Sequence, residues 1–128
     1  MIRMTNHHSH RFLQIVSDAK KRVREVGVEE VKRKLDRSED FLLIDVREDN
    51  EWAIDHLPNA IHLGKGVIER DIEQQVPELN APVVLYCGGG FRSALAAESL
   101  QRMGYTNVAS MDGGIREWRK KGYPVTRE

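Results

Sequence analysis

The sequence has one cysteine and no long apolar run, and both features limit what the protein can be. Because Cys87 is the single cysteine among 128 residues, neither an intramolecular disulfide nor a zinc site built from several cysteines can form. No apolar stretch approaches the roughly 20 residues that a membrane-spanning helix needs. The first twelve residues, MIRMTNHHSHRF, contain no apolar segment of the kind found in secretory signals. We therefore expect a cytoplasmic protein that does not cross a membrane.

An excess of charge of either sign is also absent. Lys and Arg number 20, Asp and Glu number 20, and the formal net charge is zero. This balance does not favour binding to nucleic acid or to an anionic membrane surface. The chain contains no internal repeat, and its length is typical of one domain. We expect neither a nucleic-acid partner nor a membrane partner.

We assign residues 1–11 to a flexible N-terminal tail and residues 12–128 to a single domain. The tail holds His7, His8 and His10, but histidine-rich tails usually bind metal only adventitiously, so we predict no metal site. From Phe12 onwards the apolar residues follow a helical spacing, which predicts an additional N-terminal helix over about residues 12–22.

After this helix, short apolar segments alternate with amphipathic ones. FLLIDV and PVVLYC are bounded by polar or turn residues and are typical of buried parallel strands. Strands that alternate with helices on a short chain indicate an α/β domain with a mostly parallel sheet. The predicted strands cover residues 23–26, 41–46, 60–63, 82–87 and 107–111, and the predicted helices cover residues 28–35, 48–56, 67–75, 93–103 and 114–121.

Cys87 lies at the carboxyl end of the most apolar predicted strand, where ligands bind in sheets of this kind. Three glycines, Gly88, Gly89 and Gly90, separate it from Phe91, Arg92 and the start of a helix. Consecutive glycines allow a tight curl in which backbone N–H groups point inward, and such a nest at a helix N-terminus binds an anion. A helix N-terminus and a nearby cation also stabilise a thiolate. The segment therefore favours a nucleophilic cysteine over a structural one.

This segment, YCGGGFRS, resembles the active-site loop of rhodanese-like domains. Other segments are similar to the family in order and spacing: LIDVRE, Glu51-Trp52 followed by HLPNAIHL, MDGGI followed by Trp118, and GYPV. The similarity extends over about residues 23–124. It implies a three-layer α/β/α fold with a central five-stranded parallel sheet, here with the additional N-terminal helix.

The resemblance also implies a sulfurtransferase reaction in two displacements. Cys87 would take a sulfur atom from a donor such as thiosulfate as a persulfide, and cyanide or a cellular thiol would then remove it. Cys87 and Arg92 are the implied catalytic residues. The backbone of Gly88, Gly89, Gly90, Phe91 and Arg92 would bind the substrate, and Ser93 would support the loop. No cofactor is implied, and a monomer is favoured over a dimer.

Two features of the loop affect the choice of substrate. Related phosphatases and arsenate reductases place five residues between cysteine and arginine, whereas four residues separate Cys87 from Arg92, so we disfavour both activities. Members specialised for thiosulfate often carry basic side chains in this loop, but Gly88 and Gly89 carry none. Because no second cysteine exists, the sulfur must leave to an external thiol or to a sulfur-acceptor protein. A persulfide-sensing or sulfur-carrier module remains an alternative to an enzyme.

Asp45 and Arg47 lie at the end of the predicted strand 41–46, on the same sheet edge as Cys87. We expect Asp45 to support the turn through a buried ion pair. For Arg47, contact with substrate and a purely structural ion pair are equally compatible with the sequence. His56 fits a structural position better than a general base, because a thiolate that the loop already stabilises needs none.

Overall fold

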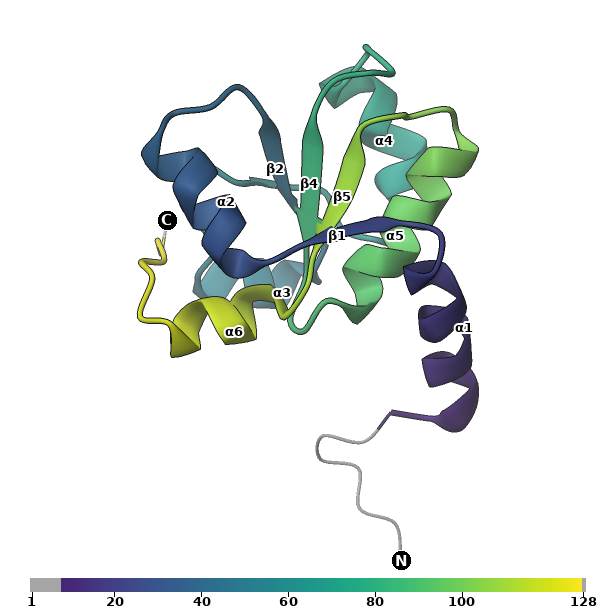
Figure 1. Cartoon of the computed structure of the whole chain (residues 1–128), viewed down its shortest axis with the longest axis horizontal. Helices are drawn as coiled ribbons and strands as arrows, with labels where there is room; N and C mark the ends of the chain where they lie inside the picture. The colour runs from purple at the N-terminus through teal and green to yellow at the C-terminus, as the bar shows by residue number, and fades with distance from the viewer. Residues whose placement is uncertain (1–7, 128) are drawn as a thin grey trace, which may run out of the picture.

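A five-stranded parallel sheet forms the centre of the protein (Figure 1). The structure is a computed structural model that describes residues 8–127. The strand order is β1-β5-β4-β2-β3, and every pair of neighbours is parallel. This confirms the predicted sheet. The strands span Arg24–Val26 (β1), Leu42–Asp45 (β2), Ile61–His62 (β3), Val83–Tyr86 (β4) and Val108–Met111 (β5).

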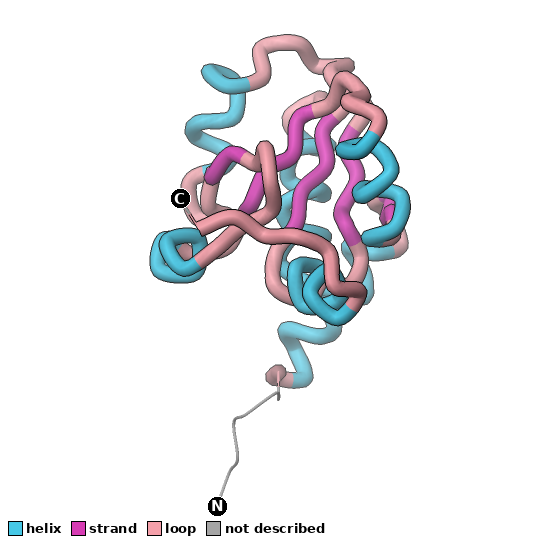
Figure 2. Tube along the Cα trace, turned by 90° about the vertical axis from the view of Figure 1, so that its left-hand side faces the viewer, coloured by secondary structure: helices cyan, strands magenta, loops and turns pink. Residues whose placement is uncertain are grey.

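Helices cover both faces of this sheet, which confirms the three-layer arrangement (Figures 1 and 2). On one face the buried residues come from the sheet and from α1, α4 and α5. On the other face they come from the sheet and from α2 and α6. The helices span His10–Lys20 (α1), Val28–Asp36 (α2), Asp49–Ile54 (α3), Ile68–Gln75 (α4), Phe91–Arg102 (α5) and Gly114–Lys120 (α6). No helix within residues 8–127 is long and apolar enough to cross a membrane.

The central strand β4 shows why its sequence is almost continuously apolar. Its four residues are all buried, because helices cover both faces of the sheet. Leu85 belongs to the core that α4 and α5 cover, and Tyr86 belongs to the opposite core. Cys87 continues this alternation and returns to the side of Leu85, at the N-terminus of α5.

Helix α1 begins two residues earlier than predicted. Ser9 caps it by accepting a hydrogen bond from the N–H of Phe12 at 3.2 Å, so His10 and Arg11 belong to the helix and not to a tail. Val16 and Ala19 are buried, and the helix packs along α5. Residues 1–7 of the predicted tail, including His7, lie outside the described residues, so the tail stays a prediction there.

Candidate active site

The loop between β4 and α5 places Cys87 at the N-terminus of a twelve-residue helix. Gly90 is the N-cap of that helix and has a φ of 100°, a conformation that strongly favours glycine. A Cβ atom at this position would also lie 3.1 Å from the backbone N of Gly113. Both the backbone conformation and the close approach of a second chain segment therefore require glycine here.

Backbone N–H groups surround the sulfur of Cys87. The N–H groups of Gly90 and Ser93 donate to Sγ at 3.2 and 3.3 Å. The thiol lies 3.5 Å from the Oγ of Ser93, which in turn is 2.7 Å from the Oγ of Ser110 on β5. Ser93 thus contacts the nucleophile through both its N–H and its hydroxyl, and its role in supporting the loop stays a prediction. These contacts also give a negative charge on Sγ two N–H donors at the positive end of a helix dipole.

Several other N–H groups of this loop remain available for a ligand. The N–H groups of Gly88, Gly89, Phe91 and Arg92 donate to no acceptor within residues 8–127. For Phe91 and Arg92 this follows from their place in the first helical turn, where N–H groups have no partner in the helix. A small anion next to Sγ would therefore meet unpaired donors.

Helix α6 holds the loop from the other side. The N–H of Ile115 donates to the carbonyl of Cys87 at 2.9 Å, and the N–H of Arg116 donates to the carbonyl of Gly88 at 3.0 Å. The preceding Gly114 has a φ of 60°, and a Cβ atom on it would lie 2.5 Å from both carbonyl oxygens. The start of α6 and the cysteine loop are thus fitted to each other through their backbones.

Two guanidinium groups lie over the glycines of the loop. A Cβ atom on Gly88 would be 3.1 Å from Nη2 of Arg92, and one on Gly89 would be 3.0 Å from Nη1 of Arg116. The two glycines therefore leave room for two cations that come from α5 and α6. The sequence predicted the first of these arginines and not the second.

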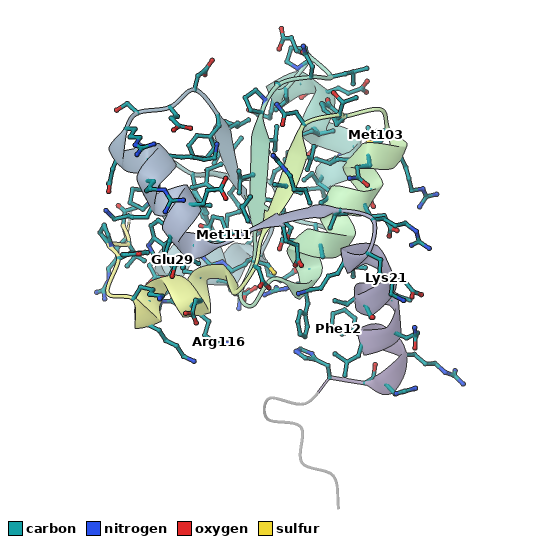
Figure 3. The ribbon with its side chains drawn as sticks, in the orientation of Figure 1. Phe12, Lys21, Glu29, Met103, Met111 and Arg116 are labelled. Carbon is teal, nitrogen blue, oxygen red and sulfur yellow. The ribbon has the colours of Figure 1, made fainter. Side chains whose placement is uncertain are left out.

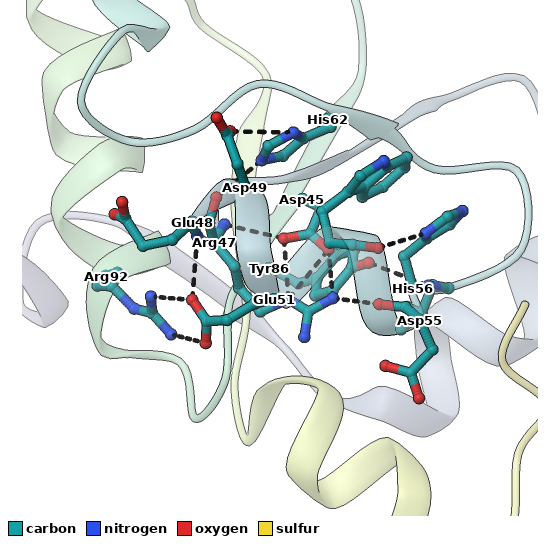
Figure 4. A network of polar contacts seen from close by, with 12 residues as sticks. Asp45, Arg47, Glu48, Asp49, Glu51, Asp55, His56, His62, Tyr86 and Arg92 are labelled. Atoms are coloured by element: carbon teal, nitrogen blue, oxygen red, sulfur yellow. Dashed lines mark hydrogen bonds and ion pairs between the residues drawn. The ribbon is translucent and has the colours of Figure 1, made fainter. Parts of the chain in front are cut away.

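Arg92 is engaged in an ion pair on its outer side (Figure 4). Its Nη1 and Nη2 atoms donate to the two carboxylate oxygens of Glu51 at 2.8 and 3.2 Å. The same carboxylate accepts the N–H of Glu48 at 3.0 Å and so caps α3. The hydrogen bond from Arg92 holds the pKa of Glu51 below its usual value, and the bond to Glu51 raises the pKa of Arg92. Arg92 thus connects the loop to α3.

A pocket of about 190 Å³ opens at Cys87. One side of it is aromatic, because the rings of His8 and Phe12 pack against Phe91, with His8–Phe12 and His8–Phe91 centroids both 5.2 Å apart. The other side carries the two guanidinium groups. Its lining comprises His8, Phe12, Cys87, Gly88, Gly89, Phe91, Arg92 and Arg116.

Asp45 and Arg47 do not line this pocket. Both are buried, and Nε and Nη2 of Arg47 donate to the carboxylate of Asp45 at 3.0 and 2.8 Å. Nη2 also donates to the carbonyl of Asp55 at 2.6 Å (Figure 4). Of the two alternatives for Arg47, this geometry favours the structural ion pair, and the proposed contact with substrate finds no support. Asp45 supports the turn that follows β2, and not the cysteine loop directly.

The buried pair affects the ionisation of its neighbourhood. Burial lowers the pKa of Arg47, but the hydrogen bond and the charge of Asp45 outweigh that effect, so the guanidinium stays charged. Burial, together with the negative charge of Asp45, raises the pKa of Tyr86, whose hydroxyl accepts the N–H of Leu57 at 3.0 Å. This network therefore connects the turns at the ends of β2 and β4.

His56 also lies outside the pocket. Its ring stacks on Trp52 with centroids 3.5 Å apart, and its backbone pairs with Thr126. Among residues 8–127, no three His, Cys, Asp or Glu side chains are grouped as metal ligands would be.

Three contributions to the site were not predicted. Glu51 lies 41 residues before Arg92 in the sequence, and the only local signal was a capping position at the start of α3. The contribution of Arg116 to the pocket depends on how closely α6 packs against the loop, and no local sequence pattern indicates that distance. The aromatic wall of His8 and Phe12 depends on where α1 packs, and the helical spacing of its sequence does not specify that.

The comparison with protein families assigns the domain that contains this loop to a known family. A family model of the rhodanese-like domain matches residues 27–121. The chain belongs to the rhodanese-like family. His8 and helix α1 with Phe12, which line one side of the pocket, lie outside the matched residues.

Relatives of known name include sulfurtransferases. The sulfurtransferase of Allochromatium vinosum is 34% identical over 103 residues, which cover 80% of this chain and 94% of that protein. The thiosulfate sulfurtransferase GlpE of Vibrio cholerae is 32% identical over 83 residues, covering 65% of this chain and 76% of GlpE. The "Putative sulfur carrier protein YrkF" of Bacillus subtilis is 32% identical over 99 residues, which cover 76% of this chain. This rhodanese-like chain spans about half (51%) of YrkF.

Solved structures share the architecture. A protein of unknown function from Rhodopseudomonas palustris, described as a possible tyrosine phosphatase, superposes with a TM-score of 0.81 at 26% identity, covering 98% of this chain and 99% of that one. The thiosulfate sulfurtransferase of Pseudomonas aeruginosa superposes with a TM-score of 0.77 at 23% identity, covering 85% of this chain and 21% of that one. At this lower identity the likeness concerns the fold alone.

Proposed function

We propose that this rhodanese-like protein is a sulfurtransferase that carries a sulfane sulfur on Cys87 as a persulfide. The observation that carries the proposal is the position of Sγ, which accepts the N–H groups of Gly90 and Ser93 beneath a pocket lined by unpaired N–H donors and two guanidinium groups. The relatives from A. vinosum and V. cholerae, both named sulfurtransferases, support it.

The reaction consists of two displacements at sulfur. In the first, the Cys87 thiolate attacks the outer sulfur of thiosulfate, the S–S bond of thiosulfate breaks, and sulfite leaves with the bonding electron pair. In the second, an acceptor such as cyanide attacks the outer sulfur of the persulfide, and the Cys87 thiolate leaves. The loop donors stabilise the negative charge on sulfur throughout, so the cycle needs neither an oxidant nor a general base.

A sulfur-carrier role is the second candidate. It is favoured by the single cysteine, since a sulfur atom on Cys87 can leave only to an external acceptor. The name of the YrkF relative points in the same direction. A carrier and an enzyme share the persulfide but differ in turnover, because an enzyme cycles when donor and acceptor are both in excess.

Phosphatase activity is disfavoured by the loop. Four residues separate Cys87 from Arg92, so the ring of N–H groups is smaller than the five-residue cradle of the related phosphatases. In addition, both Nη atoms of Arg92 donate to the carboxylate of Glu51, and this negative charge offsets the attraction of Arg92 for a phosphate dianion. We expect no hydrolysis of 4-nitrophenyl phosphate above the rate of a Cys87→Ser variant.

Intact-protein mass spectrometry tests the proposal. After a brief incubation with thiosulfate, the wild-type protein should gain the mass of one sulfur atom, and the Cys87→Ser variant should not. Addition of cyanide should remove that mass and release thiocyanate, repeatedly if both reagents are in excess. We expect Cys87→Ser to keep the urea unfolding midpoint of the wild type, because a hydroxyl can accept the same two N–H bonds. A sulfur adduct on the variant, or no adduct on the wild type with thiosulfate or an organic persulfide, would contradict the mechanism.

A further inference from the structure

Two elements outside the cysteine loop shape the pocket in which sulfur would be transferred. Helix α6 contributes Arg116, whose guanidinium lies over Gly89. Helix α1 and the residues before it contribute Phe12 and His8. Figure 3 shows Phe12 and Arg116 on the same edge of the molecule, on opposite sides of the loop that joins β4 to α5.

Arg116 has the properties of an anion-binding residue. Its side chain is exposed and forms neither a hydrogen bond nor an ion pair with any of residues 8–127. Arg92, by contrast, has Glu51 as its partner. The backbone of Arg116 is anchored to the loop, since its N–H donates to the carbonyl of Gly88 at 3.0 Å. The pocket therefore carries one cation, Arg116, that has no carboxylate partner among residues 8–127.

The aromatic wall is equally well fixed. Ser9 caps α1 directly below Phe12. At the other end of the helix, Lys20 pairs with Glu25 at 3.1 Å and with Asp112 at 3.3 Å, and its ammonium group lies 5.2 Å from the ring centroid of Phe91. Inorganic sulfur anions have no apolar part that could pack on this aromatic wall, so their binding gains no free energy from removing its surface from water. An organic substrate with an apolar part can pack on the wall and gain that free energy.

We propose that Arg116 and the aromatic wall of Phe12 and His8 determine the specificity of the pocket, selecting an organic thiol or persulfide that carries an anionic group, such as a carboxylate, beside an apolar body. The proposal rests on the proposed function, because it names the class of compound that exchanges sulfur with Cys87. An incoming thiolate of this class would attack the outer sulfur of the persulfide. The S–S bond to Cys87 would break, the Cys87 thiolate would leave, and the compound would depart as its own persulfide.

Alkylation of Cys87 tests this selectivity without any sulfur transfer. Iodoacetate and iodoacetamide react with a thiolate by the same displacement of iodide, but only iodoacetate carries a carboxylate. In the 128-residue chain we expect Arg116→Gln to lower the ratio of the iodoacetate rate to the iodoacetamide rate about tenfold, the magnitude of one hydrogen bond to a charged group. The matched control is Lys120→Gln, which removes the same charge from α6 at an exposed residue outside the pocket lining and should leave the ratio unchanged.

A second pair of variants tests the wall. Relative to iodoacetate, 4-(bromomethyl)benzoate adds an aromatic body to the same anionic group. We expect Phe12→Ala to lower its rate relative to iodoacetate about threefold to tenfold, the range for a lost aromatic contact. Ile15→Ala serves as the control, because Ile15 is exposed on the same helix and does not line the pocket.

The outcomes separate this inference from the proposed function. Equal ratios for Arg116→Gln and Lys120→Gln, or for Phe12→Ala and Ile15→Ala, overturn the corresponding half of the inference. A wild type whose Cys87 reacts with none of the three reagents overturns both halves, because the pocket then admits no ligand. If the selectivity is found but thiosulfate and organic persulfides leave no sulfur on Cys87, the proposed function fails and the selectivity stands.

Discussion

The strongest steric prediction concerns Gly114, where α6 meets the cysteine loop. Its φ of 60° lies in the left-handed region, and a Cβ atom there would lie 2.5 Å from the carbonyl oxygens of Cys87 and Gly88. Those two oxygens accept the N–H groups of Ile115 and Arg116. All the atoms in conflict belong to the backbone, so no side-chain rotation can relieve the clash. Gly114→Ala must therefore separate α6 from the loop.

The magnitude follows from two contributions. A non-glycine residue in the left-handed conformation costs about 1–2 kcal/mol. The two hydrogen bonds between α6 and the loop contribute about 0.5–1.5 kcal/mol each, and separating the segments removes both. We therefore expect Gly114→Ala to lower the free energy of unfolding by about 2–5 kcal/mol. Sulfur loading of Cys87 should fall as well, because the carbonyls that α6 holds flank the nucleophile.

Two other glycines provide controls that isolate each contribution. Gly122 has a φ of 75° but no atom within 4 Å of a Cβ position, so Gly122→Ala measures the conformational cost alone, about 1–2 kcal/mol. Gly66 has neither a positive φ nor a close neighbour, and Gly66→Ala should leave stability unchanged or slightly raised. Urea unfolding, followed by the fluorescence of the buried Trp118, gives all three values. If Gly114→Ala is no less stable than Gly122→Ala, the argument from the backbone clash is wrong.

Two further predictions concern the residues that hold the site in place. Arg92 keeps the pKa of Glu51 below the ordinary value of 4.5, so the ion pair stabilises the fold at and above that pH and loses its contribution as the pH falls through the lowered pKa. The urea midpoint of the wild type should therefore exceed that of Glu51→Gln at neutral pH, and the two midpoints should converge in acid. A difference between the midpoints that does not change with pH would contradict this. Ser93→Ala leaves the buried Oγ of Ser110 without its partner, which should cost about 1–3 kcal/mol. Adding Ser110→Ala should recover most of that loss in the same assay, whereas an equally unstable double variant would show that the hydroxyl pair is not the cause.

The sequence predicted the sheet and the cysteine loop well, because local patterns encode both. A strand covered on two faces must be apolar throughout, and PVVLYC shows this directly. A curl of N–H groups needs glycine, and Gly90 indeed has a positive φ. Helix boundaries were displaced by up to two residues, at α1 because Ser9 caps the helix before its first apolar residue and at α5 because Gly90 begins it before Ser93.

What the sequence did not predict depends on contacts between distant segments. The partners of Arg47 depend on the fold, which buries it against Asp45 and the carbonyl of Asp55 and so favours the structural ion pair. Similarly, no periodicity relates Arg116 to Gly89, which lies 27 positions earlier, since the two meet only because α6 starts against the loop. Long-range packing of this kind leaves no spacing for a pattern to match.

The glycines of the loop and the arginines around it form one arrangement. A side chain at Gly88 or Gly89 would occupy the space that the guanidinium groups of Arg92 and Arg116 now fill, since the Cβ positions lie only 3.1 and 3.0 Å from their Nη atoms. A basic residue inside the loop and a basic residue that reaches over it are therefore two alternative ways to place a cation near Cys87. In this chain the cation reaches over the loop from α6. A substitution of Arg116 can therefore change which charged compounds the pocket prefers, while the N–H donors that hold the sulfur stay in place. The loop would then serve the chemistry of sulfur, and the surrounding helices would select the compound that brings or removes it.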